Sequence, residues 1–161
     1  MNEFDDSRVA HGHPRSTAKI AGHPIHPMLV PFPIVCFVGA FVADIMFTQT
    51  GALGWQTASK WLLAVGLATA ALAAVAGLID FFGDPRIRAL GDAVKHMLAN
   101  VTAVVIEAVN LALRLGNTDF VGSTGIYLSG IVVLILLYSG WKGGELVFRH
   151  GVGVLDGDRA P

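Results

Sequence analysis

The chain has 161 residues, of which 53% are hydrophobic and 14% are charged, and its formal net charge is -1. Soluble domains carry about 25% charged residues. The composition therefore excludes a disordered chain, a solvated coiled coil and a nucleic-acid binder that relies on basic charge. The one cysteine, Cys36, excludes an internal disulfide and a thiolate zinc cluster. The class that these values favour is an integral membrane protein.

Four apolar stretches are long enough to cross a bilayer as helices, which takes roughly 20 residues each. They lie at about residues 28–47, 61–82, 96–113 and 121–149. Nothing amphipathic remains to cover them as core helices of a soluble protein. We therefore predict an all-α membrane protein, a four-transmembrane-helix bundle over residues 21–154. A mobile polar tail is expected at 1–20 and a second tail at 155–161.

Lysine and arginine are distributed unevenly between the two sides of this bundle. Nine of them lie in the N-terminal segment, the connection after the second span and the C-terminal segment, against only Lys60 and Arg114 on the other side. Positive charge in short loops marks the cytoplasmic side. We therefore expect both termini in the cytoplasm and a multi-pass protein of the bacterial cytoplasmic (inner) membrane.

The third span carries a polar stripe. At 100° per residue, His96, Asn100, Glu107 and Asn110 lie within about 80° of one another on the helix surface. Ionisable groups at membrane depth normally face the bundle interior and have partners. The stripe is therefore expected to be buried, and Asp44, near the outer end of the first span, to lie in the interior as well.

Ligand-type side chains are predicted at the cytoplasmic end of all four helices. Three or four imidazoles and two carboxylates should converge there: His23, His26, Asp80, His96, Glu145 and His150. The two halves also echo each other. Each half opens with a histidine shortly before Met-Leu (His26, His96) and closes with an acidic residue (Asp80, Glu145). A duplicated helical hairpin would place the echoed residues about a pseudo-twofold axis.

Several motifs resemble a bacterial membrane family, domain of unknown function 2231. They are the segments at 22–30, 77–80, 96–100 and 140–154, and the resemblance covers roughly residues 20–154. Lys142 departs from the pattern, which has an apolar residue there. The resemblance implies the membrane topology and no activity. Relatives joined to a Rieske iron–sulfur domain imply a redox protein as partner.

Four hypotheses remain open for the cluster. Haem b could be held by His96 with His26 or His150, and Arg149 could pair a propionate. A non-haem transition metal could be bound by residues of the cluster, with Asn100 or Arg149 supporting them: His23, His26, Asp80, His96 and Glu145.

The other two hypotheses need no cofactor. The cluster could be a hydrogen-bonded clasp of the helix ends, which makes the chain a structural membrane protein. Alternatively, a small proton or ion conduit could run along Glu107, Asn110 and Asp44. No nucleophile triad, phosphate loop or dinucleotide fingerprint is present, so catalysis by the chain alone is not expected. The expected partners are the lipid bilayer, a redox protein or a second copy of the chain.

The predicted orientation can be tested with reporter fusions. Alkaline phosphatase, which is active only outside the cytoplasm, should be inactive at either terminus, whereas green fluorescent protein should be fluorescent at both. Alkaline phosphatase inserted near position 118 should be active. An active phosphatase at the C-terminus would mean an odd number of spans.

Overall fold

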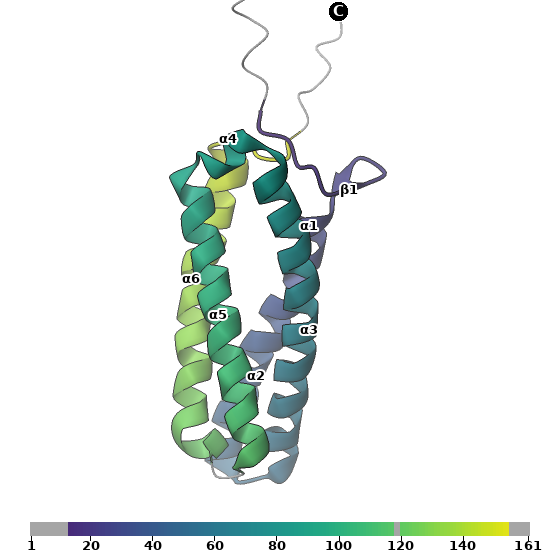
Figure 1. Ribbon diagram of the computed structural model, residues 1–161. Helices are drawn as coiled ribbons and strands as arrows, with labels where there is room; N and C mark the ends of the chain where they lie inside the picture. The colour runs from purple at the N-terminus through teal and green to yellow at the C-terminus, as the bar shows by residue number, and fades with distance from the viewer. Residues whose placement is uncertain (1–12, 118–119, 155–161) are drawn as a thin grey trace, which may run out of the picture.

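The computed structural model describes residues 13–117 and 120–154. It is all-α in its main elements, apart from one small hairpin (Figure 1). The long helices are α2 Pro31–Thr50, α3 Leu53–Gly83, α5 Gly91–Gly116 and α6 Ile126–Phe148. Short helical elements accompany them: α1 Ile25–Leu29, α4 Pro85–Arg88 and the π-helical turn η2 Val121–Gly125. The predicted tail at 155–161 and residues 1–12 of the predicted N-terminal tail lie outside the described residues.

Within the described chain, four helical segments are long and apolar enough to cross a membrane. They are Ile25–Thr50, Leu53–Gly83, Gly91–Gly116 and Val121–Phe148. The second begins eight residues before the stretch predicted from apolarity, since α3 starts at Leu53. Gly51 ends α2 with a left-handed backbone (φ 66°), which a glycine adopts without steric cost, and allows this tight turn.

The helices alternate up and down, so the molecule consists of two antiparallel hairpins, α2–α3 and α5–α6 (Figure 1). The described chain begins and ends at the same end of the bundle, where α4 joins the hairpins (Figure 1). The strands β1 Lys19–Ile20 and β2 His23–Pro24 pair antiparallel beside α1. The end of the bundle where α4 lies is called the histidine end, because His26 and His96 lie towards it. The opposite end is called the arginine end, after Arg114.

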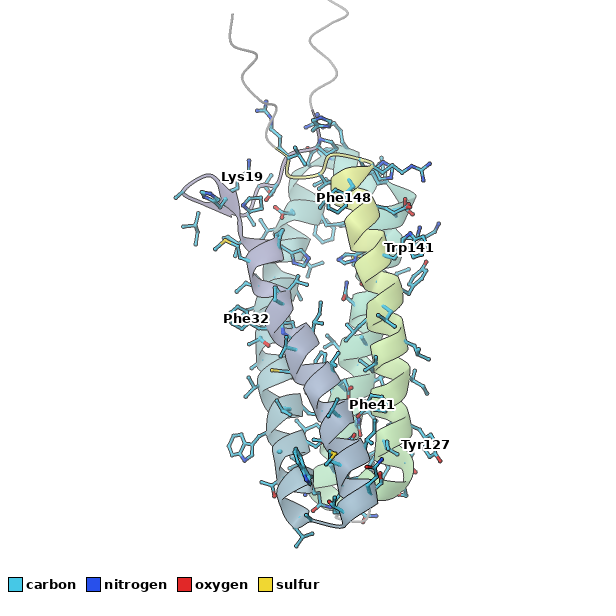
Figure 2. The ribbon with its side chains drawn as sticks, turned by 180° about the vertical axis from the view of Figure 1, so that it is seen from behind. Lys19, Phe32, Phe41, Tyr127, Trp141 and Phe148 are labelled. Atoms are coloured by element: carbon cyan, nitrogen blue, oxygen red, sulfur yellow. The ribbon has the colours of Figure 1, made fainter. Side chains whose placement is uncertain are left out.

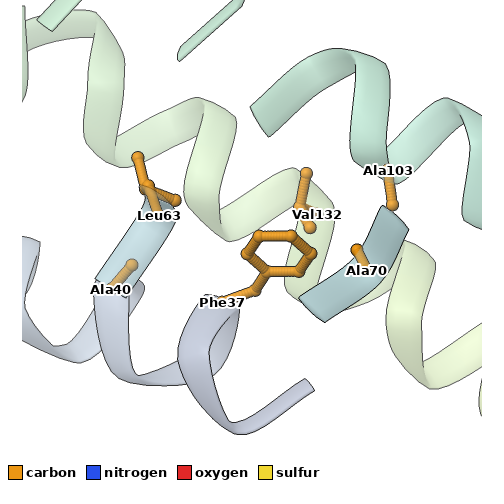
Figure 3. Packing of buried hydrophobic residues seen from close by; sticks show 6 residues of the cluster. All are labelled: Phe37, Ala40, Leu63, Ala70, Ala103 and Val132. Carbon is orange, nitrogen blue, oxygen red and sulfur yellow. The ribbon is translucent and has the colours of Figure 1, made fainter. Parts of the chain in front are cut away.

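The apolar core lies midway along the bundle and takes residues from all four long helices. Its fully or nearly fully buried members are shown in Figure 3: Phe37, Ala40, Leu63, Ala70, Ala103 and Val132. Three of the six are alanines, and small residues of this kind allow the close backbone approach that stabilises helices in lipid. At Gly66 a Cβ atom would lie 2.6 Å from Cε1 of Phe37, so only glycine leaves room for this ring.

Large apolar side chains cover the outer surface instead of the core. Tyr127 and Trp141 point away from the bundle at different heights of α6, and Phe32 points outward from α2 (Figure 2). Tyr127 and Trp141 are each 71% exposed. An apolar outer surface with amphipathic aromatic residues towards both ends is typical of helices in contact with lipid.

The close contact at Gly66 predicts a sharp difference between two glycines. Gly66→Ala should lower the free energy of unfolding by about 1–3 kcal/mol, because the new methyl group must displace Phe37. Gly140→Ala is the matched control, since a Cβ atom there meets nothing within 4 Å. The control should leave stability unchanged or raise it by up to about 1 kcal/mol through helix propensity. Unfolding in mixed micelles with a denaturing detergent measures both; equal effects would contradict the packing described.

Candidate functional site

Two imidazoles from different hairpins meet inside the bundle near the histidine end. His26 on α1 and His96 on α5 have ring centroids 6.1 Å apart and ring planes at 88°. They are separated by seventy residues in the chain. Both rings are half-buried. The echoed histidines of the two halves are therefore neighbours in space, as a duplicated hairpin predicts.

Each histidine of this pair is held by the second helix of its own half in the same way. Nδ1 of His26 lies 2.8 Å from the carbonyl oxygen of Ala73, and Nδ1 of His96 lies 2.9 Å from that of Ser139. One turn further along each helix a glycine lies against the ring. A Cβ atom would be 2.9 Å from Nδ1 of His26 at Gly77, and 3.1 Å from Cε1 of His96 at Gly143.

These contacts determine which ring nitrogen carries a proton. A carbonyl oxygen can only accept a hydrogen bond, so Nδ1 donates and the neutral ring keeps its lone pair on Nε2. Nε2 of His96 lies 3.1 Å from Nδ2 of Asn100, which donates to it. Nε2 of His26 has no hydrogen-bond partner within the described part of the chain. Both histidines therefore present an Nε2 lone pair on the side away from their anchoring helix.

The predicted layer of six converging ligands is not formed, and this prediction is wrong. Within residues 13–117 and 120–154 there is no group of three or more His, Cys, Asp or Glu side chains able to hold a metal ion. His23 is exposed and bonds the carbonyl oxygen of Ala21. His150 bonds Asp92 at 3.2 Å. Glu145 pairs with Lys142 and Arg149 on its own helix.

Asp80 does not join the histidine pair either, because its carboxylate anchors the segment that precedes α1. It accepts hydrogen bonds from the backbone N–H groups of Thr17 and Ala18, both at 2.7 Å, and from the hydroxyl of Ser16. Asp84 holds the same segment through the N–H group of Arg15. Hydrogen bonds from the Arg86 guanidinium lower the pKa of Asp84 well below its ordinary value, against the opposing effect of burial.

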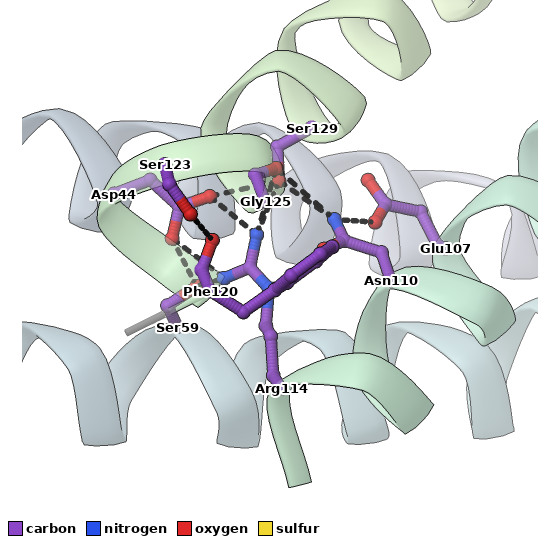
Figure 4. Close-up of polar contacts among 9 residues, drawn as sticks. All are labelled: Asp44, Ser59, Glu107, Asn110, Arg114, Phe120, Ser123, Gly125 and Ser129. Atoms are coloured by element: carbon purple, nitrogen blue, oxygen red, sulfur yellow. Dashed lines mark hydrogen bonds and ion pairs between the residues drawn. The ribbon is translucent and has the colours of Figure 1, made fainter. Parts of the chain in front are cut away.

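A second polar group, near the arginine end, is completely buried. Its centre is the ion pair of Arg114 with Asp44, two side chains with no exposed surface (Figure 4). Both guanidinium nitrogens Nη1 and Nη2 lie 2.6 Å from a carboxylate oxygen of Asp44. Ser59 and Ser129 each donate to Asp44 and accept from Arg114. We call these residues, with Asn110 and Glu107, the arginine network.

The arginine network satisfies every donor of the guanidinium. Nε of Arg114 donates to Asn110 Oδ1 at 2.8 Å, and Nη2 also reaches the carbonyl oxygen of Gly125. Gly125 closes the π-helical turn η2, and π-helical turns are frequent at functional sites. Bidentate pairing with full hydrogen bonding is what makes a charge pair tolerable inside a membrane. Asp44 and Arg114 are, like the two histidines, seventy residues apart.

Glu107 joins this network through one oxygen only. Its Oε2 accepts from Nδ2 of Asn110 at 2.8 Å, whereas Oε1 is the one buried side-chain N or O atom in the described chain without a hydrogen-bond partner. The side chain has no exposed surface. Of the predicted polar stripe of α5, Glu107 and Asn110 are buried, whereas His96 and Asn100 are half-buried.

Sequence reasoning missed Arg114, Ser59 and Ser129. Arg114 was assigned to a loop because the third span was taken to end at residue 113, but α5 continues to Gly116. The sequence does contain a signal for the burial of Arg114. Arg114 follows His96 by eighteen residues, which is five helical turns, so it falls on the same helix face as the polar stripe. No such signal marks Ser59 and Ser129, because a buried serine in a helix cannot be distinguished in sequence from any other small packing residue.

Four membrane-type helices, a histidine pair and a buried ion pair define a multi-pass helical membrane protein. Comparison with family models gives a match over residues 22–156 to DUF2231, described as a predicted membrane protein. The chain belongs to this family. Neither a search of curated proteins nor a search of solved structures returned a match.

The arginine network predicts a strong dependence of stability on each partner. Asp44→Ala leaves a buried, unpaired guanidinium and should lower the free energy of unfolding by about 3–5 kcal/mol. The double variant Asp44→Ala, Arg114→Ala should lose clearly less than the sum of the two single variants. Arg149→Ala, which removes a 70% exposed partner of Glu145, should change little and serves as the control. Additive effects in the double variant, measured by unfolding in mixed micelles, would contradict direct pairing.

Proposed function

We propose that this chain binds haem b between His26 and His96 and acts as an electron-transfer subunit of the bacterial cytoplasmic membrane. The observation that carries the proposal is the histidine pair. Two half-buried imidazoles from the two halves of the chain have ring centroids 6.1 Å apart, and Nδ1 of each contacts a backbone carbonyl oxygen of the second helix of its own half. When bound, haem supplies reversible one-electron chemistry.

The spacing of the rings supports ligation of one metal by both. His26 and His96 would hold the group, since their ring centroids lie 6.1 Å apart and Nδ1 of each ring contacts a backbone carbonyl oxygen, which leaves Nε2 as the nitrogen that would bind the metal.

The hydrogen bonds at Nδ1 support the same role. Ligating histidines usually donate the other ring N–H to a carbonyl or carboxylate, which selects the tautomer and fixes the ring orientation. Ala73 and Ser139 provide such carbonyls. Gly77 and Gly143 let each ring lie directly against its anchoring helix.

The number of ligands favours haem over a bare metal ion. A porphyrin brings four nitrogens, so two imidazoles complete the coordination, whereas zinc, iron or manganese would take further side chains. Among the described residues no third His, Cys, Asp or Glu joins the pair. The pairing of Arg149 with a haem propionate remains a prediction. A redox protein docked at the histidine end stays the predicted partner.

One observation favours a structural role as the second candidate. Nε2 of His96 already accepts a hydrogen bond from Asn100, and the two Nδ1 contacts tie α1 to α3 and α5 to α6. A pair with only this role would clasp the helices without any ligand. The two functions predict different results for the same variants.

The test is a spectrum of the protein expressed with a haem precursor and purified in mild detergent. A reduced-minus-oxidised cytochrome b spectrum and about one haem per chain are expected, with low-spin signals typical of two axial histidines. His26→Ala and His96→Ala should each lose haem or become high-spin, because one axial nitrogen is removed. His23→Ala and His150→Ala are matched controls and should retain it.

A haem-free wild-type protein under these conditions would overturn the proposal. The structural role would then be supported if His26→Ala and His96→Ala lowered the thermal stability of the haem-free protein. Elemental analysis of the same preparations detects a bare metal ion. Stoichiometric metal without haem would also overturn the proposal for haem.

A further inference from the structure

We propose that Glu107 is a proton-binding site in the membrane interior, a carboxylic acid that is neutral at rest and exchanges its proton with the arginine end. This inference does not depend on haem at the histidine pair. It rests on the charges of the arginine network, the unpartnered oxygen of Glu107 and the apolar layer beside it.

The charge balance of the network leaves no counter-ion for Glu107. Arg114 is the one cation in the group, and Asp44 already pairs with it through both carboxylate oxygens. The other helices that form the network, α3 and α6, contribute only the hydroxyls of Ser59 and Ser129. An ionised Glu107 would give the buried group a net charge of -1. Such an uncompensated charge is costly at membrane depth, so the proton is retained.

The hydrogen bonds of the carboxyl group agree with a neutral acid. A carboxylate attracts several donors, but Glu107 has one, Nδ2 of Asn110 on Oε2. The same Nδ2 also contacts Ser129 at 3.1 Å and Gly125 at 3.4 Å, so three acceptors share two hydrogens. Oε1 is fully buried without a partner in the described chain. Oε1 is therefore the atom at which we place the proton.

An apolar layer separates Glu107 from the histidine pair on every long helix. Phe37 lies between the levels of His26 and Asp44, and Ala103 lies between Asn100 and Glu107. Ala70 on α3 and Val132 on α6 occupy the corresponding positions (Figure 3). These side chains offer no hydrogen bond to a moving proton. The polar groups continue only towards the arginine end, through Asn110 and Ser129 (Figure 4).

The reaction at this site is a simple acid–base equilibrium. Glu107 releases the proton from its carboxyl oxygen to water at the arginine end, becomes a carboxylate and is reprotonated from the same side. In the carboxylate form, Arg114 lies between two anions, because Asn110 links the guanidinium to Glu107. Proton release therefore weakens the attachment of Arg114 to Asp44, the contact that joins the two hairpins.

The chain contains three glutamates, Glu3, Glu107 and Glu145, which allows selective labelling. The double variant Glu3→Gln, Glu145→Gln grown with carboxyl-labelled glutamate leaves Glu107 as the one labelled glutamate. Infrared difference spectra of labelled and unlabelled protein in lipid nanodiscs should show a protonated carboxyl C=O stretch at pH 7. Raising the pH should convert the band to the carboxylate form.

A labelled carboxylate at pH 7 would overturn the proposal. Glu107→Gln in the wild-type background is the confirming variant, since its amide oxygen still accepts from Asn110, and the acid band should be absent. If a variant does not fold, labelled wild-type protein still tests the proposal, because three ionised glutamates at pH 7 would overturn it.

The side of exchange is tested in vesicles with uniformly oriented protein, selected through a C-terminal affinity tag. Raising the pH at the arginine end alone should convert the Glu107 band within the mixing and equilibration time. Raising it at the histidine end alone should leave the band unchanged. Conversion from the histidine end would overturn the assigned direction.

Discussion

The contact on which the interior of this protein depends is the ion pair between Arg114 and Asp44. A bilayer offers no water to solvate a guanidinium, so Arg114 must find every partner within the bundle. It does so by drawing on all four long helices: Asp44 from α2, Ser59 from α3, Asn110 from α5 and Ser129 from α6. The pair fixes how deep each helix lies relative to the others and joins one hairpin to the other.

Two residue pairs join the two halves of the chain. His26 meets His96, and Asp44 pairs with Arg114; the members of each pair are separated by the same interval in the chain. One pair consists of identical side chains and the other of opposite charges. The opposite charges form a closed contact, whereas the two imidazoles form the site that we propose for haem.

The interior is thereby divided into two polar zones with an apolar layer between them. The histidine pair is half-buried; Nε2 of His96 accepts a hydrogen bond from Asn100, whereas Nε2 of His26 has no partner in the described part of the chain. The arginine network is closed to solvent and contains one carboxyl group without a counter-ion. Phe37, Ala103 and their neighbours prevent polar contact between the two. The proposed haem site and the proposed proton site are therefore separated by apolar residues within one small bundle.

The outline of this architecture follows from the sequence. Stretches of about 20 apolar residues can only be stable in a membrane as helices, because each backbone group must be satisfied within its own segment. The burial of Glu107 and Asn110 on α5 followed from angular spacing, and the nearness of His26 to His96 followed from the echo between the halves. Local patterns of this kind are set by helix geometry, which does not depend on distant residues.

The composition of each polar zone was decided only by the tertiary structure. The expected ligands Asp80, Glu145 and His150 do lie near one end, but each found a closer partner: the backbone of residues 17 and 18, a lysine on its own helix, and Asp92. Arg114 looked like a loop charge, and its burial required Asp44 and two serines from three other helices. Spacing along one helix gives the direction of a side chain. Which group it meets depends on the relative height and rotation of helices that the chain brings together from far apart.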